Sequence, residues 1–220
     1  KPTDEFEAYI NSSYETELEG FGVTGMISGP ITDTIKGRLV AKTYSDSGFV
    51  ENTFTGDDAP QEKSNVIRGT LVWDPIDDLS LTLKAQYGEF DVKGRQDMIT
   101  IASPTALAFH QLADPNFSPD FGYKKSEGDL PGRPQFDDTS NSVAQLTVEY
   151  QLGEYSLRSI SAYTEYEFEN TSDEDKGPLA FIERSRQENH EQFSQEILLS
   201  SPQGRTLEFL TGVYYQTENL

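Results

Sequence analysis

The sequence predicts an all-β fold in which about nine strands form an antiparallel up-and-down meander. Three observations predict it: segments of alternating apolar and polar residues recur, turn-forming residues separate them, and short and long connections alternate. The clearest segment, residues 79–91, places Leu or Ala at four of its first alternate positions and Tyr87 at the fifth, with polar residues between. A helix there would need apolar residues near Thr82 and Gln86, so the pattern indicates a strand with one apolar face.

Eight further segments show strand patterns of the same kind. In residues 159–168 the alternation places Ile160 and Phe168 on the apolar face and Glu165 and Glu167 on the polar face. The alternation does not determine the phase of the last two segments. In chain order, the nine predicted strands are residues 6–15, 22–30, 35–44, 65–73, 79–91, 143–152, 159–168, 190–201 and 207–216.

The connections between these segments alternate in length. Tight turns rich in Gly, Pro and Asp lie at residues 29–34, 74–78, 152–155 and 201–205. Long polar connections lie at residues 45–63, 92–139 and 170–188, while the first connection, residues 19–22, is short. Because alternate connections of a meander lie at one end, the large loops share one end. Transmembrane β-barrels of outer membranes have this asymmetry, so the sequence predicts part of a large transmembrane barrel.

The longest connection contains a predicted short helix, with Ser103 as N-cap, Pro104 in its first turn and Asp114-Pro115 after it. The long loops also hold apolar aromatic residues that could meet a ligand. The same residues could instead pack the loops against one another, and the sequence leaves both alternatives open. The candidate ligand contacts are Phe49, Phe54, Phe109, His110 and Phe181, with Phe117 and Phe121 as further loop aromatics.

Composition restricts the class of protein. The 220 residues carry a net charge of −21, which disfavours binding to nucleic acid. Only 35% of residues are apolar, yet 13 Phe and 11 Tyr are present, a combination that aromatic girdles at membrane interfaces would explain.

The absence of Cys excludes disulfides and thiolate sites, and no apolar run is long enough for a transmembrane helix. Because the chain starts at Lys1 without a leader pattern, we expect a mature or excised piece.

No enzyme motif is present, and we predict no catalytic residue, cofactor or resident metal. Acidic residues at positions 57–58 and 173–175 offer oxygen ligands for calcium, but their spacing is not that of an EF-hand, and solvated loops are the simpler interpretation. Glu165 and Glu167 lie two residues apart on one predicted strand face, a spacing compatible with a glycosidase pair, although such pairs are common on any hydrated face.

Several segments resemble the barrel of TonB-dependent outer-membrane receptors. "KPTDEFEAYI" is similar to the junction between the plug domain and the first barrel strand, and "VTGMISGPITDTIKGRLVAKTYSDSGFVEN" to the next two strands. "RGTLVWDPIDDLSLTLKAQYGEFD" resembles the following pair with its W-x-P turn, and "EQFSQEILLSSPQGRTLEFLTGVYYQ" a later hairpin. The resemblance implies that residues 1–220 are the N-terminal portion of such a barrel, with the plug domain and the C-terminal strands absent.

The resemblance also implies a function. Receptors of this family form barrels of about 22 strands in the Gram-negative outer membrane and take up a scarce nutrient, most often a ferric siderophore. The implied partners are outer-membrane lipid, the protein's own plug domain, the TonB–ExbB–ExbD complex through a TonB box, and a small-molecule ligand. The plug and the TonB box are absent from this sequence, and no binding residue carries over from the family.

Two alternatives remain open from the residues alone. A soluble β-rich module that binds carbohydrate would show the same alternation, strand by strand, with water on its polar face. A segment of a passive porin would show the same strands and the same loop sorting. A soluble module would stay monodisperse without detergent, and a porin would lack an upstream plug domain.

Overall fold

The computed structural model describes residues 1–119, 122–128, 134–179 and 181–220. The predicted loop aromatic Phe121 lies outside these residues. The structure is almost entirely β, with one short helix. Its elements are β1 (Glu7–Glu15), β2 (Gly20–Pro30), β3 (Ile35–Ser45), β4 (Val50–Asn52), β5 (Asp58–Ala59), β6 (Gln61–Ile76), β7 (Leu79–Lys93), α1 (Pro104–His110), β8 (Lys124–Lys125), β9 (Phe136–Leu152), β10 (Tyr155–Asp173), β11 (Glu183–Ser200) and β12 (Leu210–Asn219).

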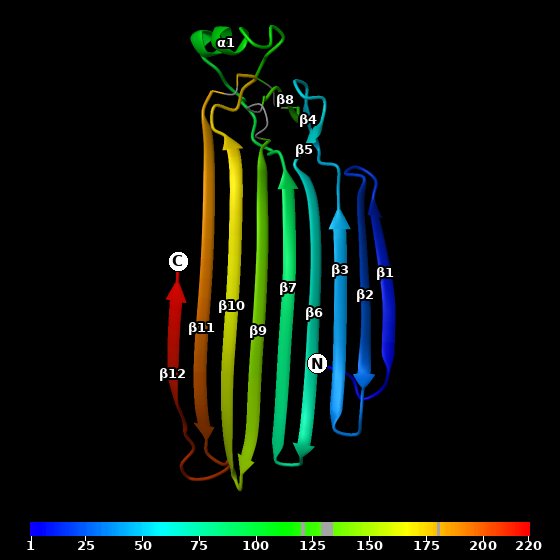
Figure 1. Cartoon of the computed structure of the whole chain (residues 1–220), viewed down its shortest axis with the longest axis vertical. Helices are drawn as coiled ribbons and strands as arrows, with labels where there is room; N and C mark the ends of the chain where they lie inside the picture. Colours follow the sequence, from blue (N-terminus) through cyan, green and yellow to red (C-terminus); the bar gives the residue numbers. More distant parts are fainter. Residues whose placement is uncertain (120–121, 129–133, 180) are drawn as a thin grey trace.

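Nine long strands form one antiparallel meander in the order β1-β2-β3-β6-β7-β9-β10-β11-β12. The three short strands form a separate small sheet, β5-β4-β8. Figure 1 shows the long strands side by side in one layer, with α1 and the small sheet at one end. The predicted fold class is confirmed, because each of the nine predicted segments overlaps one strand of the meander. The helix begins as predicted, since the Ser103 side chain accepts a hydrogen bond from the Ala106 amide.

From β2 onward, the connections are sorted by length between the two ends of the sheet with one exception. Tight turns join β2 to β3, β6 to β7 and β9 to β10 at the lower end in Figure 1, and the connections from β3 to β6, β7 to β9 and β10 to β11 lie at the upper end. The connection predicted as a tight turn at residues 201–205 is longer than predicted, because residues 201–209 join β11 to β12 at the lower end. The strands at the upper end are longer than predicted. β10 runs to Asp173 and β11 begins at Glu183, so the predicted loop 170–188 shrinks to residues 174–182. Backbone pairing continues there although both faces are polar, so hydrophobic alternation gives no signal.

The meander has two faces of different chemistry. Leu71, Leu83 and Leu146 lie in one cross-strand row and belong to the apolar face. In the next row Thr70, Lys84 and Gln145 project to the opposite, polar face. The apolar face is uncovered in the described chain, because Leu83 is 45% exposed and Leu146 is 38% exposed. The side chains therefore do not form the dry interior of a two-layer sandwich.

The predicted phase of β10 is wrong. Ile160 pairs with Thr147 and Phe168 with Thr139, which places Ile160, Ala162, Tyr166 and Phe168 on the polar face. Glu165 and Glu167, predicted on the polar face, pair with Ser142 and Ser140 on the other face. The register with β9 determines the phase. The alternation predicted the wrong phase because Ser159 and Ser161 lie on the apolar face, where both hydroxyls form hydrogen bonds with the Gln195 side chain.

Candidate functional site

The apolar face forms a band of limited height. On β7 it extends from Leu79 to Tyr87 and is followed by Glu89 and Asp91. On β9 it extends from Leu152 back to Ala144 and is followed by Ser142 and Ser140. Nine residues at about 3.3 Å each span about 30 Å along a strand. This length agrees with the about 9–11 residues of a tilted transmembrane strand.

Aromatic side chains mark both borders of this band. Near the short-turn end, the rings of Tyr155 and Phe209 lie 6.4 Å apart, centroid to centroid. Trp73 and Tyr150 lie at the same end of the apolar face. Tyr87, Tyr163 and Phe193 lie at the other border, with Tyr163 paired to Phe193. Two girdles of aromatic residues that flank an apolar band are typical of transmembrane barrels.

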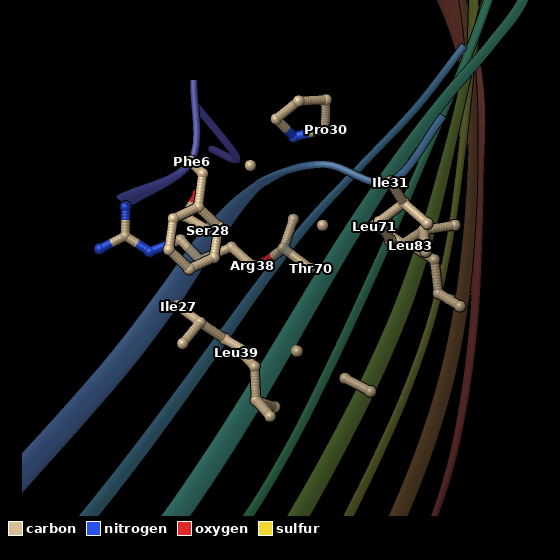
Figure 2. A pocket seen from close by; sticks show the side chains of 14 residues that line it. Phe6, Ile27, Ser28, Pro30, Ile31, Arg38, Leu39, Thr70, Leu71 and Leu83 are labelled. Atoms are coloured by element: carbon tan, nitrogen blue, oxygen red, sulfur yellow. The ribbon is translucent and has the colours of Figure 1, made fainter. Parts of the chain in front are cut away.

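A depression interrupts the apolar face near the short-turn end. Its volume is about 430 Å³, and Gly37 and Gly69 form part of its floor because they have no side chain. Figure 2 shows Ile27 and Leu39 on one side of the depression and Ile31, Leu71 and Leu83 grouped on the other. The apolar lining continues the surface of the band into the depression.

Carboxylates occupy the same face directly beyond the band, toward the long loops. Ionised carboxylates are costly to bury in hydrocarbon, so this level of the sheet belongs in water. The acidic residues at this level are Glu89, Asp91, Asp138, Glu165, Glu167, Glu169 and Glu191. Glu165 and Glu167 are thus members of an acidic belt, and the glycosidase pair considered above has nothing further to distinguish it.

The long loops pack against one another above the sheet. We call residues 46–60, 94–128 and 174–182, where described, the loop cluster. Backbone hydrogen bonds join its parts: the Glu51 amide donates to the Tyr123 carbonyl at 2.9 Å, and the Thr53 amide to the Lys125 carbonyl at 2.8 Å. The Gly128 amide donates to the Gly177 carbonyl at 3.0 Å. The longest loop is therefore ordered in its described part.

A buried polar network lies inside the loop cluster. Lys125 and Glu127 form an ion pair whose side chains are only 3% and 0% exposed. The Asn52 side chain donates to the Glu127 carbonyl at 2.9 Å and accepts from the Glu127 amide at 3.2 Å. Lys125 Nζ also donates to the Arg95 carbonyl at 2.7 Å. Sequence reasoning missed this network, because Asn52 and Glu127 are 75 residues apart and neither belongs to a motif.

The structure brings three of the five predicted ligand contacts together. The rings of Phe109 and Phe181 lie 6.1 Å apart and those of Phe109 and His110 lie 5.8 Å apart. Phe49 lies elsewhere in the loop cluster, 6.0 Å from Tyr123, and Phe54 approaches Gly128. The four phenylalanines are exposed, Phe181 by 72%, so their role as ligand contacts stays a prediction.

His110 is buried, with 7% of its surface exposed. Its ring lies 4.6 Å from that of Phe117, and a Cβ on Gly177 would lie 2.1 Å from its Nδ1 atom. His110 therefore packs the helix against the 174–182 loop, where only glycine fits opposite it. His190, the second histidine, lies on β11 with Nε2 3.9 Å from a carboxylate oxygen of Glu218.

The acidic segment 172–175 lies at the base of the loop cluster. Burial raises the pKa of Asp173 to about 7, and repulsion from Asp175 and Glu127 contributes to this rise. The Asp173 amide donates to the Gln135 side chain at 3.1 Å, which holds this carboxylate in the interior. Within the described ranges, no three acidic or histidine side chains are placed to hold a metal ion.

We expect the loop cluster to be more stable at low pH than at high pH. A carboxyl whose folded pKa is raised binds more protons folded than unfolded, so its contribution is present at acidic pH and is lost as the pH rises through about 7. Hydrogen exchange of residues 124–128, corrected for intrinsic rates, should show an opening free energy about 1–3 kcal/mol higher at about pH 5.5 than at about pH 8. Asp173→Asn should flatten this difference. Greater protection at the higher pH would contradict it.

None of the helices in the described chain has the length and apolar character needed to cross a membrane. No protein-family model matches the sequence, and no curated protein sequence matches it. Solved structures do match. The ferric yersiniabactin uptake receptor FyuA from Yersinia pestis is similar over 99% of this chain and 31% of its own, with a TM-score of 0.75 and 18% identity.

Two further structures show the same likeness. The ferric-catecholate import receptor Fiu from E. coli K12, in its open form, is similar over 99% of this chain and 35% of its own (TM-score 0.72, 14% identity). The siderophore receptor PirA from Acinetobacter baumannii is similar over 99% and 30% (TM-score 0.66, 16% identity). The chain spans about a third of the length of these receptors. The predicted resemblance therefore holds at the level of the fold: the chain has the fold of a segment of the large antiparallel barrels of siderophore receptors.

Proposed function

We propose that the chain is the N-terminal portion of the barrel of an outer-membrane receptor that actively takes up a scarce nutrient, a ferric siderophore, in a Gram-negative bacterium. One observation carries the proposal. A single-layer meander with an uncovered apolar band, two aromatic borders and loops sorted to one end resembles siderophore receptors along 99% of its length. The named ligands of those receptors supply the substrate class.

The two faces of the meander have different roles in the proposed receptor. The apolar face contacts the acyl chains of outer-membrane lipid. Neighbouring strands of the meander form hydrogen bonds with each other's backbone amide and carbonyl groups, because lipid offers these groups no partners. The polar face lines the lumen and contacts the plug domain. Energy for transport comes from TonB–ExbB–ExbD through a TonB box, and both the plug and the box lie outside this sequence.

The loop cluster is the proposed site of ligand capture. Its buried Lys125–Glu127 pair and backbone bonds hold the cluster together, and the exposed rings of Phe49, Phe54, Phe109 and Phe181 give it an apolar surface. Rigid support for exposed aromatic groups is a common arrangement in ligand-binding loops. His110 is buried and its ring lies 5.8 Å from that of Phe109, so it supports this apolar surface from within the loop cluster.

Growth under iron limitation tests the proposal. A strain that lacks the gene should lose growth on at least one ferric chelate from a panel, and the full-length gene should restore it only in a TonB-positive background. Uptake that is equal with and without TonB would instead support a passive porin. A protein that stays monodisperse without detergent and binds carbohydrate would support a soluble module.

A further inference from the structure

The depression near the short-turn end opens on the face of the sheet that the proposed function places in lipid. Its volume is about 430 Å³. Branched apolar side chains from four strands and one turn wall it, as Figure 2 shows: Ile27, Ile31, Leu39, Leu71 and Leu83. The depression is therefore a hollow in the lipid-facing surface and not a part of the lumen.

Two glycines leave the floor of the depression open. Gly37 pairs with Leu71, and Gly69 pairs with Leu39, so both lie on the apolar face. A Cβ on Gly69 would meet no heavy atom within 4 Å. A Cβ on Gly37 would lie 2.8 Å from Cδ1 of Ile31, so the end of this side chain covers Gly37. The space that the protein leaves unfilled therefore lies above Gly69, beside the Ile31 wall.

An apolar hollow at this level of the sheet suits a hydrocarbon occupant. The bilayer core holds no water to fill it, and apolar cavities without water bind hydrocarbon. The lining continues the apolar band, so the hydrocarbon next to it is a lipid acyl chain. Because lipid tails are as apolar as Leu, the gain comes from dispersion contacts. A walled hollow offers one chain more of these contacts than the flatter surface beside it.

The tight turns next to the depression carry negative charge. Residues 31–34 and 74–78 contain four Asp and neither Lys nor Arg. Three of the four carboxylates, those of Asp33, Asp77 and Asp78, are exposed. A lipid headgroup at this level therefore meets several carboxylates, which attract an ammonium group and repel an additional anionic group.

The nearest cations lie on the other face of the sheet. Arg38 lines the depression, but it pairs with Thr70 on the polar face, and its guanidinium donates to the Lys1 carbonyl at 3.4 Å. Lys36, two residues earlier on the same face of β3, pairs with Asp4. On the described strands that wall the depression, no Lys or Arg thus offsets the turn carboxylates on the apolar face at this level.

We propose that the depression binds one acyl chain of a phospholipid whose headgroup carries an ammonium group. Gly37 follows the turn 31–34 by three residues, and Leu71 precedes the turn 74–78 by three, which is about 10 Å along a strand. A lipid with its chain in the depression therefore has its headgroup near the acidic turns. Short turns of outer-membrane barrels are periplasmic, so this lipid belongs to the periplasmic leaflet. The inference rests on the proposed function, because the apolar face must contact lipid.

Photocrosslinking of the full-length protein in detergent tests the site. The probe is phosphatidylethanolamine with a diazirine near the end of one chain, and mass spectrometry of peptides maps where it attaches. We expect crosslinks concentrated in residues 37–39 and 69–71 over the rest of the apolar face. Unlabelled phosphatidylethanolamine should compete at least about threefold better than phosphatidylglycerol with the same chains, because the turns are acidic.

Gly69→Leu fills the depression from its floor, where open space accommodates the new side chain. Crosslinking in residues 37–39 should fall at least about fivefold, because the chain loses its contacts with the walls. Gly25→Leu is the matched control. Gly25 pairs with Ala41 on the same face, and a Cβ there also meets open space, but it lines a different hollow that includes Glu89. This control should leave the labelling of the depression unchanged.

A second variant removes a wall instead of filling the space. Ile31→Ala lies in an exposed turn, and it should lower crosslinking in residues 37–39 at least about twofold. Circular dichroism that shows the same β content in all three variants separates a loss of the site from a loss of the fold.

Three results would overturn the inference. They are crosslinks spread evenly along the apolar band, equal competition by the two phospholipids, or equal labelling in Gly69→Leu and Gly25→Leu. Growth on ferric chelates separates this test from the proposed function. TonB-dependent growth with evenly spread crosslinks removes only the lipid site, and site-specific labelling without such growth removes only the uptake assignment.

Discussion

Replacing Glu127 by Ala should destabilise the loop cluster by about 3–5 kcal/mol, because it leaves the Lys125 ammonium buried without its partner. The change also removes a side chain that is fully buried in the cluster. We expect the effect to be local, since the long strands are paired independently of this network. Hydrogen exchange should show faster opening of residues 50–53 and 124–128, with unchanged protection in β7 and β9.

The exposed pair between Lys124 and Glu51 provides the control. Its atoms lie 2.7 Å apart, but both side chains are about half exposed. Glu51→Ala should therefore change the opening free energy by no more than about 1 kcal/mol. A double variant, Lys125→Met with Glu127→Leu, should recover part of the loss, since no unpaired charge is left inside. Equal effects of Glu127→Ala and Glu51→Ala would contradict the buried network.

Leu83→Arg should strongly impair assembly in a bilayer, because it places a charge in the middle of the apolar band. The cost of such a substitution on a lipid-facing strand is about 2–4 kcal/mol at the bilayer midplane. Thr82→Arg is the matched control, since Thr82 is adjacent in sequence and faces the polar side. Its expected cost is below about 1 kcal/mol, because the new side chain lies on the polar, lumen-facing side and not in hydrocarbon.

Denaturant titration of the full-length protein in liposomes, at equilibrium, measures the free energy of unfolding of both variants. The predicted order of stability is unaltered protein, then Thr82→Arg close to it, with Leu83→Arg far below. If Thr82→Arg were the more damaging of the two, the assignment of the faces would be reversed. If both were equally harmful, the sheet would be buried on both sides.

The strands could be predicted from the sequence because their signal is local. The alternation of apolar and polar residues in 79–91 and 143–152 follows directly from the difference between the two faces, and Gly, Pro and Asp residues mark the tight turns. The same signal fails beyond the apolar band. There both faces are hydrated, so β9, β10 and β11 extend past their predicted ends without any change in pattern.

The phase of β10 and the loop network could not be predicted because neither is a local property. In the sequence, Ser159 and Ser161 indicate a polar face. In the structure they lie on the apolar face, because both hydroxyls form hydrogen bonds with the side chain of Gln195, more than 30 residues away. In the sequence, Lys125 and Glu127 have the pattern of solvated charges. In the structure Asn52 forms a hydrogen bond with Glu127 and the Arg95 carbonyl accepts one from Lys125, and these residues are distant in sequence. The start of the loop helix could be predicted for the opposite reason, since Ser103 and Pro104 act within a single turn. Its end could not, because the helix stops at His110, before Asp114-Pro115.

Site-directed spin labelling of single cysteines at residues 79 to 87 tests the central claim most directly, and residues 1–220 contain no native cysteine. In the full-length protein in liposomes, oxygen, which partitions into lipid, should reach the odd positions more readily than the even ones. A water-soluble nickel complex should reach the even positions, which face the lumen and the plug domain, more readily than the odd ones. The two accessibilities should alternate with a period of two across the segment. Odd positions that are shielded from both reagents would show a packed protein interior on the apolar face and would contradict the membrane barrel.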